Sequence, residues 1–181
     1  MIGMPWFDSE ANRAAFLKLL APGPGEKILD VGAGLGIIAD SVRSTGGSEV
    51  YAADHSERRI AKMRETYPLL KSCVANSESL PFPDSYFDKV YSTLAMHHFK
   101  DERKSIQEFA RVLKPGGLLL IVELRPFSAR GVFLGLENAI MRLHLKRLDM
   151  NQLAEELKEQ RFEFRTMTVG SFVYIESRKG R

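Results

Sequence analysis

The clearest candidate for a ligand-binding element is a glycine-rich loop, DVGAGLG, at residues 30–36. It follows an apolar segment, 27–31, that reads as a buried strand, and it leads into a segment that reads as a helix. Glycine lets the backbone turn sharply and approach a ligand closely, and the start of the next helix offers free N–H groups. The pattern favours a nucleotide-like ligand. The alternative is a tight turn whose glycines serve packing alone.

The spacing in this loop distinguishes between classes of nucleotide. A dinucleotide-binding loop requires G-x-G-x-x-G, and Ile37 stands where its third glycine would be. Asp30 precedes Gly32 by two residues, where its carboxylate would oppose a pyrophosphate but would suit a ligand that carries an ammonium group. A nicotinamide-dependent oxidoreductase is therefore the weaker interpretation.

Further residues that could do chemistry stand at the ends of expected strands. Asp54 ends the second strand, where a carboxylate can accept hydrogen bonds from both ribose hydroxyls, although it could instead cap the helix expected near Ser56. His97 and His98 follow the fourth strand, and since imidazole titrates near neutrality, either could act as a base or contact a substrate. The alternative is that one of them caps or packs against the next helix. Glu123 ends the fifth strand and is either a further contact or a residue that holds the sheet edge.

The chain alternates strands with helices in the order that brings such strand ends together. Strands are expected at 27–31, 48–54, 69–75, 87–95 and 118–123, and helices at 9–20, 36–44, 56–66 and 101–113. The KPGG segment at 114–117 reads as a stop and turn. A helix over 149–160 precedes two strands around Gly170 that read as an antiparallel hairpin. This order predicts an α/β fold with a mostly parallel sheet, and a single domain over residues 1–181.

The composition excludes several classes of protein. The chain has 181 residues, 44% of them hydrophobic and 27% charged, which argues against a disordered, collagen-like or disulfide-scaffold protein. The net charge of +3 is too small to indicate a nucleic-acid partner. A lone cysteine, Cys73, and four histidines without ligand spacing predict no metal site. Because no signal peptide or membrane-spanning stretch is apparent, we expect a soluble, cytoplasmic protein.

Four segments in this order resemble the motifs of class I S-adenosylmethionine-dependent methyltransferases: ILDVGAGLG, VYAADHS, ESLPFPDSYFDKV and FARVLKPGGLLLIVE. They are most similar to the small-molecule subset called type 11, which includes quinone-biosynthesis C-methyltransferases, and the resemblance covers roughly residues 10–124. It implies a Rossmann-like, seven-stranded, mostly parallel sheet with an antiparallel C-terminal hairpin and helices on both faces. The implied activity is methyl transfer from S-adenosylmethionine to a small, apolar acceptor.

The resemblance also implies which residues contact the methionine and ribose parts of this cofactor. Asp30, Gly32, Ala33 and Gly34 match the loop that holds the methionine half, where a carboxylate near the ammonium group is physically reasonable. Asp54 matches the acid that binds the ribose.

For the rest of the cofactor, the sequence departs from the family in two places. His55 stands where a residue packs on the adenine, although histidine is not the commonest choice there. Asn76 replaces the acid that usually accepts a hydrogen bond from the adenine amino group, and its amide oxygen can still accept one. Ser77 follows at a position whose N–H often meets the adenine. Thr93 ends the fourth strand, where the family closes over the methionine part.

Residues 125–148 form a basic, apolar stretch in place of a short link after the fifth strand. We expect an inserted helix that serves as a substrate lid, a dimer contact or a membrane-surface face, or else an ordinary helix that packs on the sheet.

Two other functions stay open at this point. The chain could be a non-catalytic S-adenosylmethionine-binding module that acts in a complex, or it could methylate RNA or protein. The sequence STLAMHH after the fourth strand lacks the Asn-Pro-Pro-Tyr signature of amino-directed nucleic-acid methyltransferases, which argues against nucleic acid. Methyl transfer itself can depend mostly on proximity and alignment, and a base is needed only when the acceptor must lose a proton.

Overall fold

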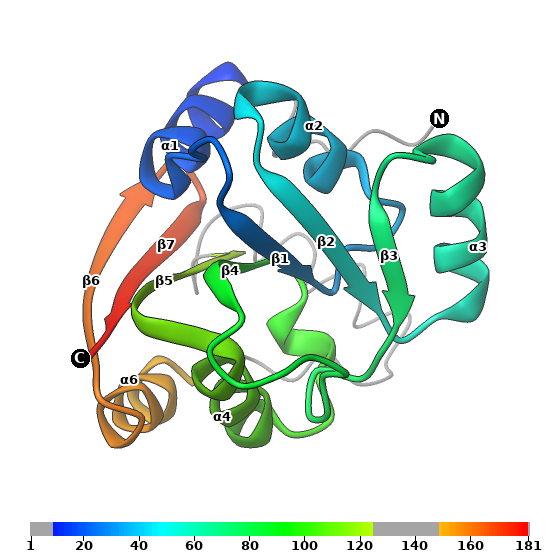
Figure 1. Cartoon of the computed structure of the whole chain (residues 1–181). Helices are drawn as coiled ribbons and strands as arrows, with labels where there is room; N and C mark the ends of the chain where they lie inside the picture. The colour runs from blue at the N-terminus through cyan, green and yellow to red at the C-terminus, as the bar shows by residue number, and fades with distance from the viewer. Residues whose placement is uncertain (1–8, 125–148, 181) are drawn as a thin grey trace, which may run out of the picture.

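A seven-stranded sheet organises the chain (Figure 1). The computed structural model describes residues 9–124 and 149–180. The strand order is β3-β2-β1-β4-β5-β7-β6, and β7 is the strand that runs antiparallel to its neighbours. The strands are β1 (Lys27–Val31), β2 (Glu49–Asp54), β3 (Lys71–Val74), β4 (Phe87–Thr93), β5 (Leu113–Leu124), β6 (Phe162–Val169) and β7 (Phe172–Lys179). The predicted mostly parallel sheet with an antiparallel C-terminal hairpin is confirmed.

Helices cover both faces of this sheet (Figure 1). They are α1 (Glu10–Leu20), α2 (Ile37–Gly46), α3 (Glu57–Thr66), α4 (Glu102–Val112) and α6 (Met150–Glu159), with a 3-10 turn η1 (Met96–His98). The first three contribute to one apolar cluster and α4 and α6 to the other. Alternate residues of β5 enter opposite clusters, as Leu119 and Leu120 do. Because both faces are covered, β5 reads as a continuous apolar run rather than an alternating one.

The KPGG segment differs from its prediction. Residues 114–117 lie within β5 instead of forming a turn before it. Phe87 of β4 pairs with Leu113, and Lys89 of β4 pairs with Leu118. The pairing register therefore shifts across this segment, and β5 continues through it without ending. Gly116 takes a positive φ of 76° there. A backbone partner on β4 on either side of the segment therefore outweighs the local turn signal of Pro and Gly.

The inserted segment predicted at 125–148 lies outside the described residues. Among the residues that are described, no helix combines the length and apolar character needed to cross a membrane.

The glycine-rich loop is held between β1 and α2 by backbone contacts. The N–H groups of Gly32 and Ala33 both donate to the carbonyl oxygen of Ala53 on β2, at 2.8 and 3.0 Å. Gly32 has a φ of 79°, a region that L side chains rarely adopt, and a Cβ there would come 2.5 Å from the Cβ of Ala95. The loop thus brings the end of β1 against the end of β4 at a distance that only glycine allows.

We therefore expect Gly32→Ala to be more destabilising than Gly25→Ala. Gly25 has a similar φ of 74° but faces open space, so its substitution costs only the left-handed backbone strain, about 1–2 kcal/mol. Gly32→Ala adds a steric overlap that costs a further amount of about 1–3 kcal/mol. Urea unfolding of both variants measures the difference, and equal losses would show that the β1–β4 approach has room for a methyl group.

Candidate active site

Asp54 is the charged group around which the carboxyl edge of the sheet is organised. It ends β2, is 2% exposed, and accepts two backbone hydrogen bonds. One oxygen, Oδ2, accepts from the N–H of Gly34 at 2.9 Å, and the other, Oδ1, accepts from the N–H of Ser56 at 2.9 Å. Ser56 in turn accepts from the N–H of Arg59 and caps α3. Asp54 therefore shapes the start of α3 and also faces the glycine loop, while its expected contact with a ribose stays a prediction.

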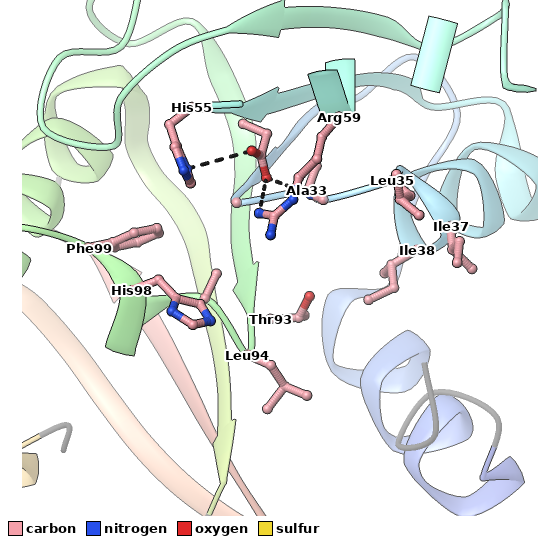
Figure 2. Close-up of a pocket in the computed structure, with 14 residues that line it drawn as sticks. Ala33, Leu35, Ile37, Ile38, His55, Arg59, Thr93, Leu94, His98 and Phe99 are labelled. Carbon is pink, nitrogen blue, oxygen red and sulfur yellow. Dashed lines mark hydrogen bonds and ion pairs between the residues drawn. The ribbon is translucent and has the colours of Figure 1, made fainter. Parts of the chain in front are cut away.

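Two basic side chains also approach the Asp54 carboxylate (Figure 2). Arg59 Nη1 lies 3.5 Å from Oδ2, and His55 Nδ1 lies 3.6 Å from Oδ1. Both side chains are more than half exposed, while the carboxylate is buried. Two exposed basic side chains thus lie beside one buried carboxylate at this edge of the sheet.

A cavity of about 330 Å³ opens beside Asp54. Its walls come from the glycine loop, the start of α2, the ends of β2 and β4, and η1 (Figure 2). The lining residues predicted from sequence are Gly32, Ala33, Gly34, Asp54, His55, Thr93 and His98. This volume lies within the range of small-molecule and cofactor sites.

A second hollow of about 260 Å³ continues from this cavity toward the end of β3. The two share the residues Gly32, Asp54, His55, His98 and Phe99. The second is also lined by Asn76 and Ser77. The predicted binding residues from four separate strand ends therefore border one continuous groove.

Asp30 is the predicted cofactor residue that does not line this groove. It is 1% exposed and pairs in register with Tyr91 of β4, whose ring packs edge-on against Phe16 of α1. Neither Asp30 carboxyl oxygen has a hydrogen-bond partner among the described residues. Burial raises the pKa of Asp30 to about 8, an effect that the neighbouring Tyr91 hydroxyl offsets only in part. The expected contact between Asp30 and an ammonium group stays a prediction.

The two candidate catalytic histidines occupy different positions on η1. His98 lines both hollows, whereas His97 Nδ1 lies 3.0 Å from Oε2 of Glu123. The other Glu123 oxygen accepts from the N–H of Met96 at 2.8 Å. Burial lowers the pKa of His98, and the neighbouring His97 lowers it further when that ring is protonated. A neutral His98 ring therefore faces the groove at neutral pH.

Several residues of the groove were not identified from the sequence. Arg59 and Phe99 line it together with three apolar residues around the start of α2: Leu35, Ile37 and Ile38. Arg59 stands one turn into the helix after Asp54, a spacing that could have indicated it. Leu94 has a φ of 51°, a strained conformation for a non-glycine residue that tends to occur at functional sites. Its backbone conformation carries no signal in the sequence.

The residues of the groove fit S-adenosylmethionine chemically. The glycine loop can take up the methionine part, the buried Asp54 carboxylate can accept hydrogen bonds from a ribose, and the hollow beside Asn76 and Ser77 can take up an adenine. Within residues 9–124 and 149–180, no three His, Cys, Asp or Glu side chains gather as they would around a metal ion.

Comparison with known proteins gives the family. Residues 29–121 match the family described as "Methyltransferase domain". The chain is 34% identical over 106 residues to a ubiquinone/menaquinone biosynthesis C-methyltransferase of Bordetella avium, a stretch that covers 55% of this chain and 41% of that protein. It is also 34% identical over 114 residues to an O-methyltransferase of Pyrenophora dematioidea, covering 60% of this chain and 43% of that one. The chain thus spans less than half the length of these curated relatives.

The fold has close counterparts among solved structures. An S-adenosylmethionine-dependent methyltransferase from Mesorhizobium loti superimposes with a TM-score of 0.80 over 96% of this chain and all of that one, at 20% identity. Because the family match spans half of the sequence, the resemblance seen in the motifs is confirmed, S-adenosylmethionine is the cofactor that it implies, and the chain belongs to the methyltransferase-domain family.

Proposed function

We propose that this chain binds S-adenosylmethionine in the groove at the carboxyl edge of the sheet and transfers its methyl group to a small, apolar molecule. The observation that carries the proposal is the buried Asp54 carboxylate, which faces the glycine loop across a cavity of cofactor size. The methyltransferase relatives support the same activity.

In this proposal, the cofactor lies along the groove from β4 to β3. Its methionine part lies against Gly32, Ala33 and Gly34 and reaches Thr93, and its ribose hydroxyls donate to Asp54. The adenine lies between His55 and the loop of Asn76 and Ser77. These assignments agree with the residues that line the two joined hollows.

The acceptor is proposed to enter beside η1. Leu94 and Phe99 line the cavity near η1, and Leu35 and Ile38 line it at the start of α2, so its apolar walls suit an apolar ring better than a charged molecule. One relative carries the name of a C-methyltransferase of quinone biosynthesis and another that of an O-methyltransferase. A phenol or quinol therefore fits both the lining and the relatives.

His98 is the proposed base for an acceptor that must lose a proton. As the acceptor attacks the methyl carbon, a new bond forms to that carbon, the carbon–sulfur bond breaks, and its electron pair stays on sulfur. The acceptor's proton passes to the neutral His98 ring and then to water. The lowered pKa of His98 keeps the ring ready to accept it at neutral pH.

The proposal is tested by titration calorimetry with S-adenosylmethionine and S-adenosylhomocysteine, with NAD as the control. Binding of the first two alone, followed by methylation of a panel of phenols and quinols detected by mass spectrometry, is the expected result. Binding without any methylation would favour the module that acts in a complex. Binding of NAD alone would remove the methyltransferase proposal.

Replacing Asp54 should weaken cofactor binding. Asp54→Ala leaves the ribose hydroxyls and two backbone N–H groups without their acceptor. Cofactor binding should therefore become weaker by about 1–3 kcal/mol. Calorimetry measures the loss, and thermal unfolding shows whether the variant is folded. Glu57→Ala, which removes a nearby exposed acid of α3, is the matched control and should bind normally. An unchanged affinity in folded Asp54→Ala would remove Asp54 from the site.

The pH dependence of methylation should report on His98. Because burial lowers the pKa of His98, the rate for a phenolic acceptor should be flat from pH 8 to about 7 and fall only at a pH below the usual histidine value of about 6.5. His98→Gln should lower kcat by about 100-fold or more and remove this acidic limb. Initial rates across the pH range give the profile, and an acidic limb that persists in His98→Gln would assign it to another group.

A further inference from the structure

Glu123 is a buried carboxylate that stands at the end of an otherwise apolar strand. It is 3% exposed, and the five residues before it in β5 are fully buried apolar residues. Burying a charge costs free energy unless its partners compensate, and an apolar residue would serve the packing of β5 better. The groups that contact the Glu123 carboxylate therefore indicate its role.

Both oxygens of Glu123 are directed at η1. Oε1 accepts from the N–H of Met96 at 2.8 Å, and Oε2 lies 3.0 Å from Nδ1 of His97. The turn that carries both histidines is thus fixed to β5 by one side chain. A carboxylate at this distance favours the proton on Nδ1 of His97 and leaves Nε2 as an acceptor.

His97 passes this constraint to His98 through direct contact. The two ring centroids lie 4.1 Å apart with an interplanar angle of 50°. His98 faces the groove, whereas His97 is not among the groove residues. The two tilted rings are therefore in contact, with His98 on the groove side and His97 beside the buried Glu123 carboxylate.

Glu123 also affects the protonation of His98 through its charge. Arg59 places a positive charge near His98, as do His97 and His55 when they are protonated, and Glu123 is the anion that opposes them. A proton that arrives on His98 enters a positive environment that this carboxylate offsets.

We propose that Glu123 and His97 are positioning residues that hold the His98 ring at the groove and set its readiness to take a proton from the acceptor. This inference rests on the proposed methyl transfer and narrows it to acceptors that must lose a proton, such as phenols and quinols. Among the described residues, His98 lines the groove, whereas Glu123 and His97 do not.

The test is NMR titration of the histidine rings of ¹⁵N-labelled full chain, in the wild type and in Glu123→Gln, with single histidine variants for assignment. In the wild type, His97 should carry its proton on Nδ1. Glu123→Gln should lower the pKa of His98, because it removes the anion that opposes the cationic groups around that ring, and should lower the population of His97 with its proton on Nδ1. Glu176→Gln, which removes a carboxylate of β7 paired with Arg165, is the matched control and should change neither value.

A kinetic readout separates positioning from a merely structural role. For a phenolic acceptor, Glu123→Gln should lower kcat by about tenfold, part of the roughly 100-fold that a positioned base contributes, and leave the affinity for S-adenosylmethionine unchanged. Should Glu123→Gln not fold, His97→Asn tests the same link, since it removes a ring that lowers the pKa of His98 and should therefore raise that pKa.

Unchanged histidine titrations in Glu123→Gln, or an unchanged titration of His98 in His97→Asn, would overturn this inference even if S-adenosylmethionine still binds. Absence of cofactor binding in the wild type would instead overturn the proposed function, so the two failures are distinguishable.

Discussion

The pair of hydrogen bonds accepted by Asp54 is the interaction on which the groove depends. Through Gly34 it fixes the loop after β1, and through Ser56 it fixes the start of α3. These two segments form adjacent walls of the same hollow, and they are separated in sequence by the whole of α2 and β2. A single buried carboxylate thus sets the width of the groove, and its own negative charge is offset by N–H dipoles and by the nearby Arg59. The ends of the other strands add side chains to the walls that the loop after β1 and the start of α3 form.

Much of the fold could be predicted because local and long-range signals agree. The alternation of apolar runs with amphipathic segments gave nearly every helix and strand, and Gly170 marked the final hairpin. The KPGG segment failed because its local composition indicates a turn, whereas pairing with β4 on both sides keeps it in the strand. A turn propensity reflects only the few residues of the segment itself. The residues that pair with its two ends, Phe87 and Lys89, lie far away in the sequence, so their effect is not visible locally.

The site was predictable to the extent that its residues sit in motifs. Asp54, the glycines and Asn76 were found because they follow strands at family-like spacing, and they border one groove. The different positions of His97 and His98 could not be inferred, since neighbouring residues in a 3-10 turn point in different directions. Arg59 was missed because a basic residue on an exposed helix face resembles any other solvated charge.

The buried carboxyl group of Asp30 makes the stability of the folded chain depend on pH. Its carboxyl ionises near pH 4 in an unfolded chain but near pH 8 when buried in β1. Folding between these values therefore takes up a proton at this residue. As the pH rises from about 4 to about 8, this group favours the unfolded chain more and more, and the contribution levels off only above its folded pKa. A buried residue of β1 thus makes the native state hold one more proton than the unfolded chain, so the pH sensitivity between about 4 and 8 originates in the core rather than at the surface.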